Sequence, residues 1–122
     1  MNVAQHYQQL IAWQKAIVMV TDTYRLTSGF PREEIYGLTS QMRRAAVSVP
    51  SNIAEGAGRR TSGEFVQALG HAYGSLCELE TQVTIAGNLS YLDGTRVEAF
   101  LEQTAEVGRI TNGLISSLTT DH

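Results

Sequence analysis

The segment from residue 36 to residue 60 carries two side-chain stripes of helical period, and it restricts the possible folds more than any other part of the chain. The apolar stripe is Leu38, Met42, Ala45, Val49 and Ile53. The polar stripe is Gln41, Arg44, Ser48, Asn52, Glu55 and Arg59. Steps of three and four residues are typical of the faces of one amphipathic helix. Small residues such as Ala46 and Ser51 lie among the polar ones. We therefore expect another helix or subunit to pack close to the polar face.

Three further segments repeat apolar residues with the same period, and short breaks separate all four. The predicted helices cover about residues 7–27, 31–56, 62–87 and 93–118. The third helix can be capped by Thr61 or Ser62 and the fourth by Asp93, all typical N-cap residues, and Pro31 suits the first turn of the second helix. Since the loops are short and strand signals are absent, the sequence predicts an all-α fold. We expect one domain over residues 1–122, an antiparallel up-down-up-down four-helix bundle.

The other three predicted helices also have apolar seams for a bundle core. These are Leu10, Trp13, Ile17, Val20 and Tyr24 in the first helix, Phe65, Leu69, Ala72, Leu76, Leu79, Val83 and Ala86 in the third, and Val97, Leu101, Thr104, Val107, Thr111, Leu114 and Leu118 in the fourth. The first helix has further apolar residues off its seam, and such a helix usually packs against two partners. Gly70 and Gly74 lie off the third seam. Glycine disfavours helix, so this pair indicates close approach of another backbone.

The charge content points to a partly covered surface. Charged residues make up 17% of the chain, against about 25% in typical globular domains, which indicates that another subunit covers part of the molecule. The net charge of −3 divides unevenly: residues 1–61 hold seven Lys/Arg and four Asp/Glu (+3), and residues 62–122 hold two and eight (−6). An acidic total argues against strong binding of nucleic acid.

The chain has one cysteine, Cys77, so it cannot form an internal disulfide, and metal-binding Cys or His spacings are absent. Cys77 is predicted to be a small buried side chain. No apolar run approaches the roughly 18 residues of a membrane span, and the N-terminus lacks the pattern of a signal peptide. The sequence therefore predicts no membrane contact and a cytoplasmic location.

The polar stripe of the second helix can be aligned with the third helix. Because the loop between them centres near residue 61, facing residues of an antiparallel pair have numbers that sum to about 123. Ser48 then faces Ser75, and Asn52 faces His71. We predict a network of hydrogen bonds and ion pairs, either within one subunit or across an interface between subunits. Its candidates are Gln41, Arg44, Ser48, Asn52, Glu55, His71, Ser75 and Glu78.

A different interpretation assigns the arginines to phosphate binding. The candidates for phosphate contact are Arg43, Arg44, Arg59 and Arg60. Guanidinium groups suit phosphate oxygens, and repetition around an oligomer would strengthen a weak site. Against this interpretation, the chain has only one lysine, and no aromatic residues alternate with the arginines to stack on bases.

Catalytic chemistry has little support in the sequence. His6, His71 and His122 lie far apart and outside any metal motif. The segment AEGAGRR (residues 54–60) follows a helix and lacks the GK[ST] ending of a phosphate loop. The paired Glu-x-x-His motifs of di-iron bundles are absent. We therefore predict no catalytic residues, no cofactor-binding residues and no metal ligands.

Several blocks of the sequence resemble one family. They are GLTSQMRRAAVSVPSNIAEGAGR (residues 37–59), AWQKA (residues 12–16), YRLT followed by FP (residues 24–31) and AYGSLCELETQ (residues 72–82). The chain is similar in these blocks to the four-helix-bundle proteins encoded in intervening sequences of large-subunit ribosomal RNA genes. The resemblance covers roughly residues 8 to 92. It implies a bundle that assembles into a ring, typically a homopentamer.

The resemblance implies little about activity, because the role of the family is mostly unassigned. A related branch, the accessory protein of diversity-generating retroelements, is a basic ring that binds nucleic acid and a reverse transcriptase. From the residues and the resemblance together, we expect a non-enzymatic oligomeric interaction or scaffold module of unknown partner. The alternative is a nucleic-acid or ribonucleoprotein accessory factor that uses the arginines of the second helix.

Overall fold

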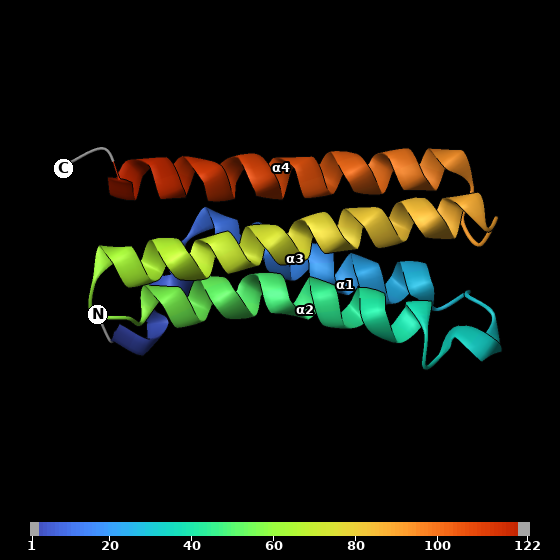
Figure 1. The fold of residues 1–122 in the computed structure, drawn as a ribbon, viewed down its shortest axis with the longest axis horizontal. Helices are drawn as coiled ribbons and strands as arrows, with labels where there is room; N and C mark the ends of the chain where they lie inside the picture. Colours follow the sequence, from blue (N-terminus) through green and yellow to red (C-terminus); the bar gives the residue numbers. More distant parts are fainter. Residues whose placement is uncertain (1–2, 120–122) are drawn as a thin grey trace.

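The protein is an antiparallel four-helix bundle, as the sequence predicts (Figure 1). A computed structural model describes residues 3–119. The four helices are α1 (Ile11–Thr27), α2 (Leu38–Ala57), α3 (Ser62–Asn88) and α4 (Gly94–Thr119), with short 3-10 helices η1 (Val3–Gln9) and η2 (Arg32–Glu34). The α1–α2 connection and the α3–α4 turn lie at one end of the bundle. The α2–α3 turn and η1 lie at the other end (Figure 1).

The core forms where the apolar faces of α2 and α3 meet, and these two faces were predicted correctly. All five residues of the predicted α2 stripe are buried, and so is the predicted α3 seam apart from the half-buried Phe65. In α4, Thr104, Val107 and Thr111 are buried as predicted, together with Phe100 and Gly108. The hydroxyl of Thr104 donates to Glu80 at 2.6 Å, which allows a polar residue in this seam.

The predicted core face of α1 is correct only in part, because Leu10, Trp13 and Val20 are half-buried against the core but Ile17 and Tyr24 are exposed. Its buried residues are Ala12, Ala16, Met19, Thr23 and Thr27. The predicted seam lies one residue further round the helix, about 100° from the buried face. Ile17 is 39% exposed and Tyr24 44% exposed, whereas Met19 is 0% exposed. The two alanines let α1 approach its neighbours closely, and therefore the larger side chains stay outside.

Two predicted helix starts are also wrong. The first helix begins at Ile11 rather than near Tyr7, because η1 precedes it. The second begins at Leu38 rather than at Pro31, since Gly37 adopts a non-helical conformation (φ −113°, ψ −115°) before it. The carboxylate of Glu34 accepts the backbone N–H of Leu38 at 3.0 Å and thereby caps the new start.

The starts of α3 and α4 agree with the sequence. The hydroxyl of Thr61 accepts the backbone N–H of Glu64 at 3.1 Å, and the carboxylate of Asp93 accepts that of Arg96 at 2.9 Å. Both residues therefore satisfy a donor that the helix itself leaves unpaired. None of the helices in residues 3–119 is long and apolar enough to span a membrane.

Candidate functional site

An apolar groove runs along the outside of the bundle between α1 and α2. It consists of two adjoining hollows of about 290 and 440 Å³, and Val47 lines both. The first hollow is lined by Tyr7, Trp13, Ile17, Val20, Val47, Pro50, Ser51 and Ala54. Trp13 is half-buried and packs edge-on against Tyr7, with ring centroids 5.4 Å apart. The groove therefore holds most of the stripe that the sequence assigned to the core.

Arg43 stands at one end of the apolar groove and links α2 to α1. Its Nε donates to the Thr27 hydroxyl at 2.9 Å, and its Nη2 donates to the Tyr24 carbonyl at 3.3 Å. Its guanidinium also lies over the Tyr24 ring, 4.6 Å from the centroid. Arg43 is thus held by contacts within the chain, a role that the sequence analysis missed because the C-terminal turn of α1 gives no signal for it.

A small polar network connects α2 to α3 at the position given by the antiparallel alignment. The hydroxyls of Ser48 and Ser75 are 2.8 Å apart. The amide of Asn52 donates to the Ser48 carbonyl at 2.8 Å and to the Ser48 hydroxyl at 3.0 Å. All three residues are half-buried, so these bonds satisfy polar groups along the contact between the helices.

The network is smaller than the sequence predicted. Within residues 3–119, four of the candidates make no side-chain hydrogen bond or ion pair. They are Gln41, Arg44, His71 and Glu78. Arg44 is exposed and lines the second hollow of the groove beside Tyr24, so it does not reach across to α3. This placement removes Arg44 from the predicted network between α2 and α3.

Glu55 joins a different pair. Its carboxylate accepts from Arg59, one helical turn later, at 2.7 Å. Asn52, Glu55, Arg59 and His71 line a polar hollow of about 340 Å³ between α2 and α3. The side chains of Glu55 and Arg59 are 64% and 50% exposed, so their ion pair adds little stability.

The four candidate phosphate-binding arginines do not form one cluster. Arg43 and Arg44 lie near the start of α2, whereas Arg59 and Arg60 lie beyond its end. A helix of 20 residues is about 30 Å long. Arg43 and Arg59 already have partners, while Arg44 and Arg60 are exposed and make no side-chain bond to any residue between 3 and 119.

A hydrogen-bonded pair joins the two connections at one end of the bundle. The Tyr91 hydroxyl donates to the Glu34 carboxylate at 2.8 Å, and the Tyr91 ring packs on Phe30 at 5.4 Å between centroids. The bond from the Leu38 backbone, together with that from Tyr91, lowers the pKa of Glu34 below its ordinary value of 4.5. The same bond to Glu34 raises the pKa of Tyr91 above 10.0.

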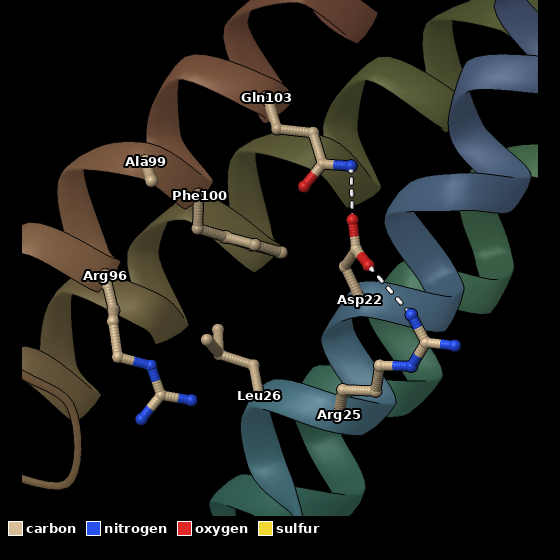
Figure 2. A pocket seen from close by; sticks show the side chains of 7 residues that line it. All are labelled: Asp22, Arg25, Leu26, Arg96, Ala99, Phe100 and Gln103. Atoms are coloured by element: carbon tan, nitrogen blue, oxygen red, sulfur yellow. Dashed lines mark hydrogen bonds and ion pairs between the residues drawn. The ribbon is translucent and has the colours of Figure 1, made fainter.

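A further hollow of about 300 Å³ lies between α1 and α4 (Figure 2). Asp22 accepts from Gln103 at 2.9 Å, and Arg25 lies 3.9 Å from the same carboxylate. The hollow is lined by Asp22, Arg25, Leu26, Arg96, Ala99, Phe100 and Gln103. No local sequence pattern indicates this hollow, because its two sides come from helices at opposite ends of the chain.

The remaining reactive side chains are dispersed. Cys77 is exposed on α3, so the prediction that it is buried is wrong. Its position opposite the core face of α3 explains the exposure. In the part of the chain that the structure describes, no three His, Cys, Asp or Glu side chains are grouped as a metal site would require.

Comparisons with known proteins place the chain in a family. A solved structure with a similar fold is that of a protein of unknown function from the S23 ribosomal protein family of Bacteroides thetaiotaomicron VPI-5482. The two are 15% identical, with a TM-score of 0.80 over 87% of this chain and 96% of the other, and this likeness concerns the fold alone. No curated protein matches the chain. Residues 8–113 match the 23S rRNA-intervening sequence protein family. The resemblance in the sequence is thereby confirmed, and the chain belongs to the 23S rRNA-intervening sequence protein family.

Proposed function

We propose that the protein is a non-enzymatic module that assembles with copies of itself through the apolar groove and offers binding surfaces to a partner. The observation that carries this proposal is the orientation of α1. This helix buries Ala12 and Ala16 and leaves Ile17 and Tyr24 exposed. A continuous apolar surface of this kind on a small domain is typical of an interface between subunits.

The groove is also better suited to burial than the other exposed apolar side chains of α1. The hollow around Ile17 has no charged residue in its lining. Val18 is 54% exposed, but it lies on the side of α1 that carries Lys15, Asp22 and Arg25. Because charged groups resist removal from water, the hollow around Ile17 is the part of the groove that a partner would cover, whereas Arg43 and Arg44 line the adjoining hollow.

We take the assembly to be a closed ring, most simply the homopentamer that the family resemblance implies, and we place it in the cytoplasm. The low charge content and the single cysteine are consistent with both statements. We assign the protein a binding role rather than a catalytic one. His6 in η1 and His71 in α3 lie on different elements and are not grouped as a pair of catalytic bases would be.

The alternative role as a nucleic-acid accessory factor has less support. Arg43 is bonded to Thr27 and Tyr24, and Arg59 is paired with Glu55. Of the four candidate arginines, only Arg44 and Arg60 would be available to phosphate groups, and Arg44 lies in the first half of α2 whereas Arg60 lies beyond its end. The acidic net charge of −3 also opposes such binding.

Size exclusion with light scattering tests the proposal. The wild-type chain of 13.3 kDa should elute as a multiple of that mass. Ile17→Glu should reduce the mass to that of the monomer, because a carboxylate in the groove cannot be buried without a partner. Val18→Glu is the matched control, since it adds the same charge to the next position of α1, and its mass should equal that of the wild type.

Three outcomes would contradict the proposal or redirect it. A monomeric wild type would refute self-assembly. Disruption by Val18→Glu but not by Ile17→Glu would move the interface to the α1–α4 side. The same run with a mixed RNA and DNA pool should leave the mass unchanged at low salt. A mass that rises with nucleic acid and falls again at high salt would favour the accessory factor.

A further inference from the structure

The apolar groove has no occupant within the described chain, and the charge distribution of the bundle indicates which surface can fill it. The exposed residues of α4 include Arg96, Glu98, Glu102 and Arg109. A partner that covered α4 would have to remove these charges from water. The hollow of the groove around Trp13 carries no charged side chain. The part of the occupant that fills this hollow is therefore expected to be uncharged as well, as the centres of protein interfaces generally are. Arg43 and Arg44 line the adjoining hollow, where an acidic group of the occupant would fit.

The outward side of α3 is such a surface on this same chain. We call it the outer face of α3, and most of its residues are exposed, uncharged and small. They are Gln67, Gly70, Gly74, Cys77, Thr81, Ile85 and Asn88, and the exposed charged residue among them is Glu78, one turn after Gly74. The face lies opposite the α3 seam that packs into the core. A helix with this composition can approach another helix closely, because few side chains stand between the two backbones.

The glycines of this face are not explained by packing within the chain. A Cβ added at Gly70 or Gly74 would meet nothing within 4 Å. At Gly56, by contrast, a Cβ would lie 2.6 Å from that of Ala68, and at Gly108 it would lie 3.2 Å from Leu76. Those two glycines make room for neighbours inside the bundle. Gly113 of α4 is equally open but stands alone, whereas Gly70 and Gly74 lie one turn apart and together leave a gap that a neighbour outside the chain would fill.

We propose that the apolar groove of one copy receives the outer face of α3 of a second copy. The large side chains of Trp13, Ile17 and Tyr24 would pack where the glycines leave room, and the charged face of α4 would remain in water. The groove and the outer face of α3 are different surfaces, so each copy uses both. Such a heterologous contact repeats from copy to copy and closes into a ring when its rotation allows. This inference rests on the proposed self-assembly and specifies its geometry.

A pair of glycine substitutions tests this geometry. Gly74→Leu places a large side chain on the outer face of α3, and its mass in light scattering should fall to the 13.3 kDa of one chain. Gly113→Leu is the matched control. Gly113 is also exposed within a helix and also has nothing within 4 Å of an added Cβ, but it lies on α4. Leucine favours helix more than glycine, so both variants should remain folded, Gly113→Leu in the assembly and Gly74→Leu as a helical monomer in circular dichroism.

Crosslinking gives a second test that does not depend on disrupting the assembly. Val47→Cys puts a thiol in the groove, and the native Cys77 is exposed on the outer face of α3. A short bismaleimide should join the two between copies and give a ladder of covalent oligomers in a denaturing gel. The variant with both Val47→Cys and Cys77→Ser should remain uncrosslinked.

The outcomes separate this inference from the proposed function. Loss of assembly in Gly74→Leu but not in Gly113→Leu, together with the crosslinked ladder, would support the contact. A Gly74→Leu variant that still assembles would overturn the contact. Covalent dimers of the Val47→Cys, Cys77→Ser variant would also overturn it, because they would show that the groove of one copy packs on the groove of another. Self-assembly would survive either result. A monomeric wild type would refute both.

Discussion

The close contact between the end of α2 and the start of α3 gives a prediction whose sign can be worked out. Gly56 is buried, and a Cβ built there would lie 2.6 Å from the Cβ of Ala68 and 3.0 Å from Cδ1 of Phe65. Carbon atoms prefer separations of about 3.5–4.0 Å. The Phe65 ring can turn aside, but the Ala68 methyl is fixed to the backbone of α3. Gly56→Ala therefore requires the two helices to separate by about 1 Å.

The magnitude follows from two opposing effects. Overpacking a well-packed core costs about 1–3 kcal/mol, and replacing glycine by alanine within a helix recovers about 1 kcal/mol. Gly56→Ala should therefore lower the free energy of unfolding by about 1 kcal/mol. Gly113→Ala has open space around the new methyl and should raise it by up to about 1 kcal/mol. The two variants should thus differ by about 2 kcal/mol, or roughly 6–12 °C in melting temperature.

Thermal unfolding followed by circular dichroism, at equal protein concentrations, measures this difference. Adding Ala68→Gly to Gly56→Ala should restore part of the loss, because it removes the methyl that the new one meets. The two substitutions should therefore couple favourably in a double-mutant cycle. If Gly56→Ala raised the melting temperature as much as Gly113→Ala, the close approach of α2 and α3 at this point would be refuted.

Three further predictions concern single contacts. Thr61→Ala should lower the free energy of unfolding by about 1 kcal/mol in chemical denaturation, because it removes the N-cap of α3. Arg43→Met should lower it by about 1–2 kcal/mol in the same assay, since the bonds to Thr27 and Tyr24 are lost, and an unchanged midpoint would mean that they contribute nothing. The lowered pKa of Glu34 stabilises the fold above pH 4.5, and this contribution is lost as the pH falls through the folded-state pKa. Tyr91→Phe removes one of the two bonds that lower this pKa. As the pH is reduced from 7 to 3, the melting temperature should therefore fall less steeply in Tyr91→Phe than in the wild type.

The fold could be predicted because, in α2 and α3, the stripe of apolar residues coincides with the buried face. In α1 it does not, since two of its buried residues are polar. The hydroxyl of Thr23 donates to the Met19 carbonyl at 2.8 Å, and that of Thr27 donates to the Thr23 carbonyl at 2.8 Å. A threonine satisfied by its own helix can be buried almost as an apolar residue. Composition alone does not reveal that bond, so the sequence pattern favours the larger apolar stripe as the core.

The candidate sites could be predicted where helical period and antiparallel pairing determine the neighbours. The contact of Ser48 with Ser75 follows from the alignment across the α2–α3 turn. The partners of Arg43 and the hollow between α1 and α4 depend on how helices distant in the sequence are rotated and shifted along one another. A single sequence does not encode that rotation in any local pattern. The start of α2 was missed for a related reason, because the cap at Leu38 comes from the side chain of Glu34 in η2.

The misplaced seam of α1 nevertheless has physical meaning. Leu10, Trp13, Ile17, Val20 and Tyr24 recur at steps of three and four, the spacing of a helix that packs along another helix. Within the described chain, α1 meets the bundle core mainly through Ala12, Ala16 and Met19 instead. Leu10, Trp13 and Val20 pack partly against the core, and Tyr7 of η1 packs on Trp13, so the described chain leaves mainly Ile17 and Tyr24 of the stripe uncovered. On the proposed assembly, the sequence pattern identified a genuine seam, and the partner helix is α3 of the next copy.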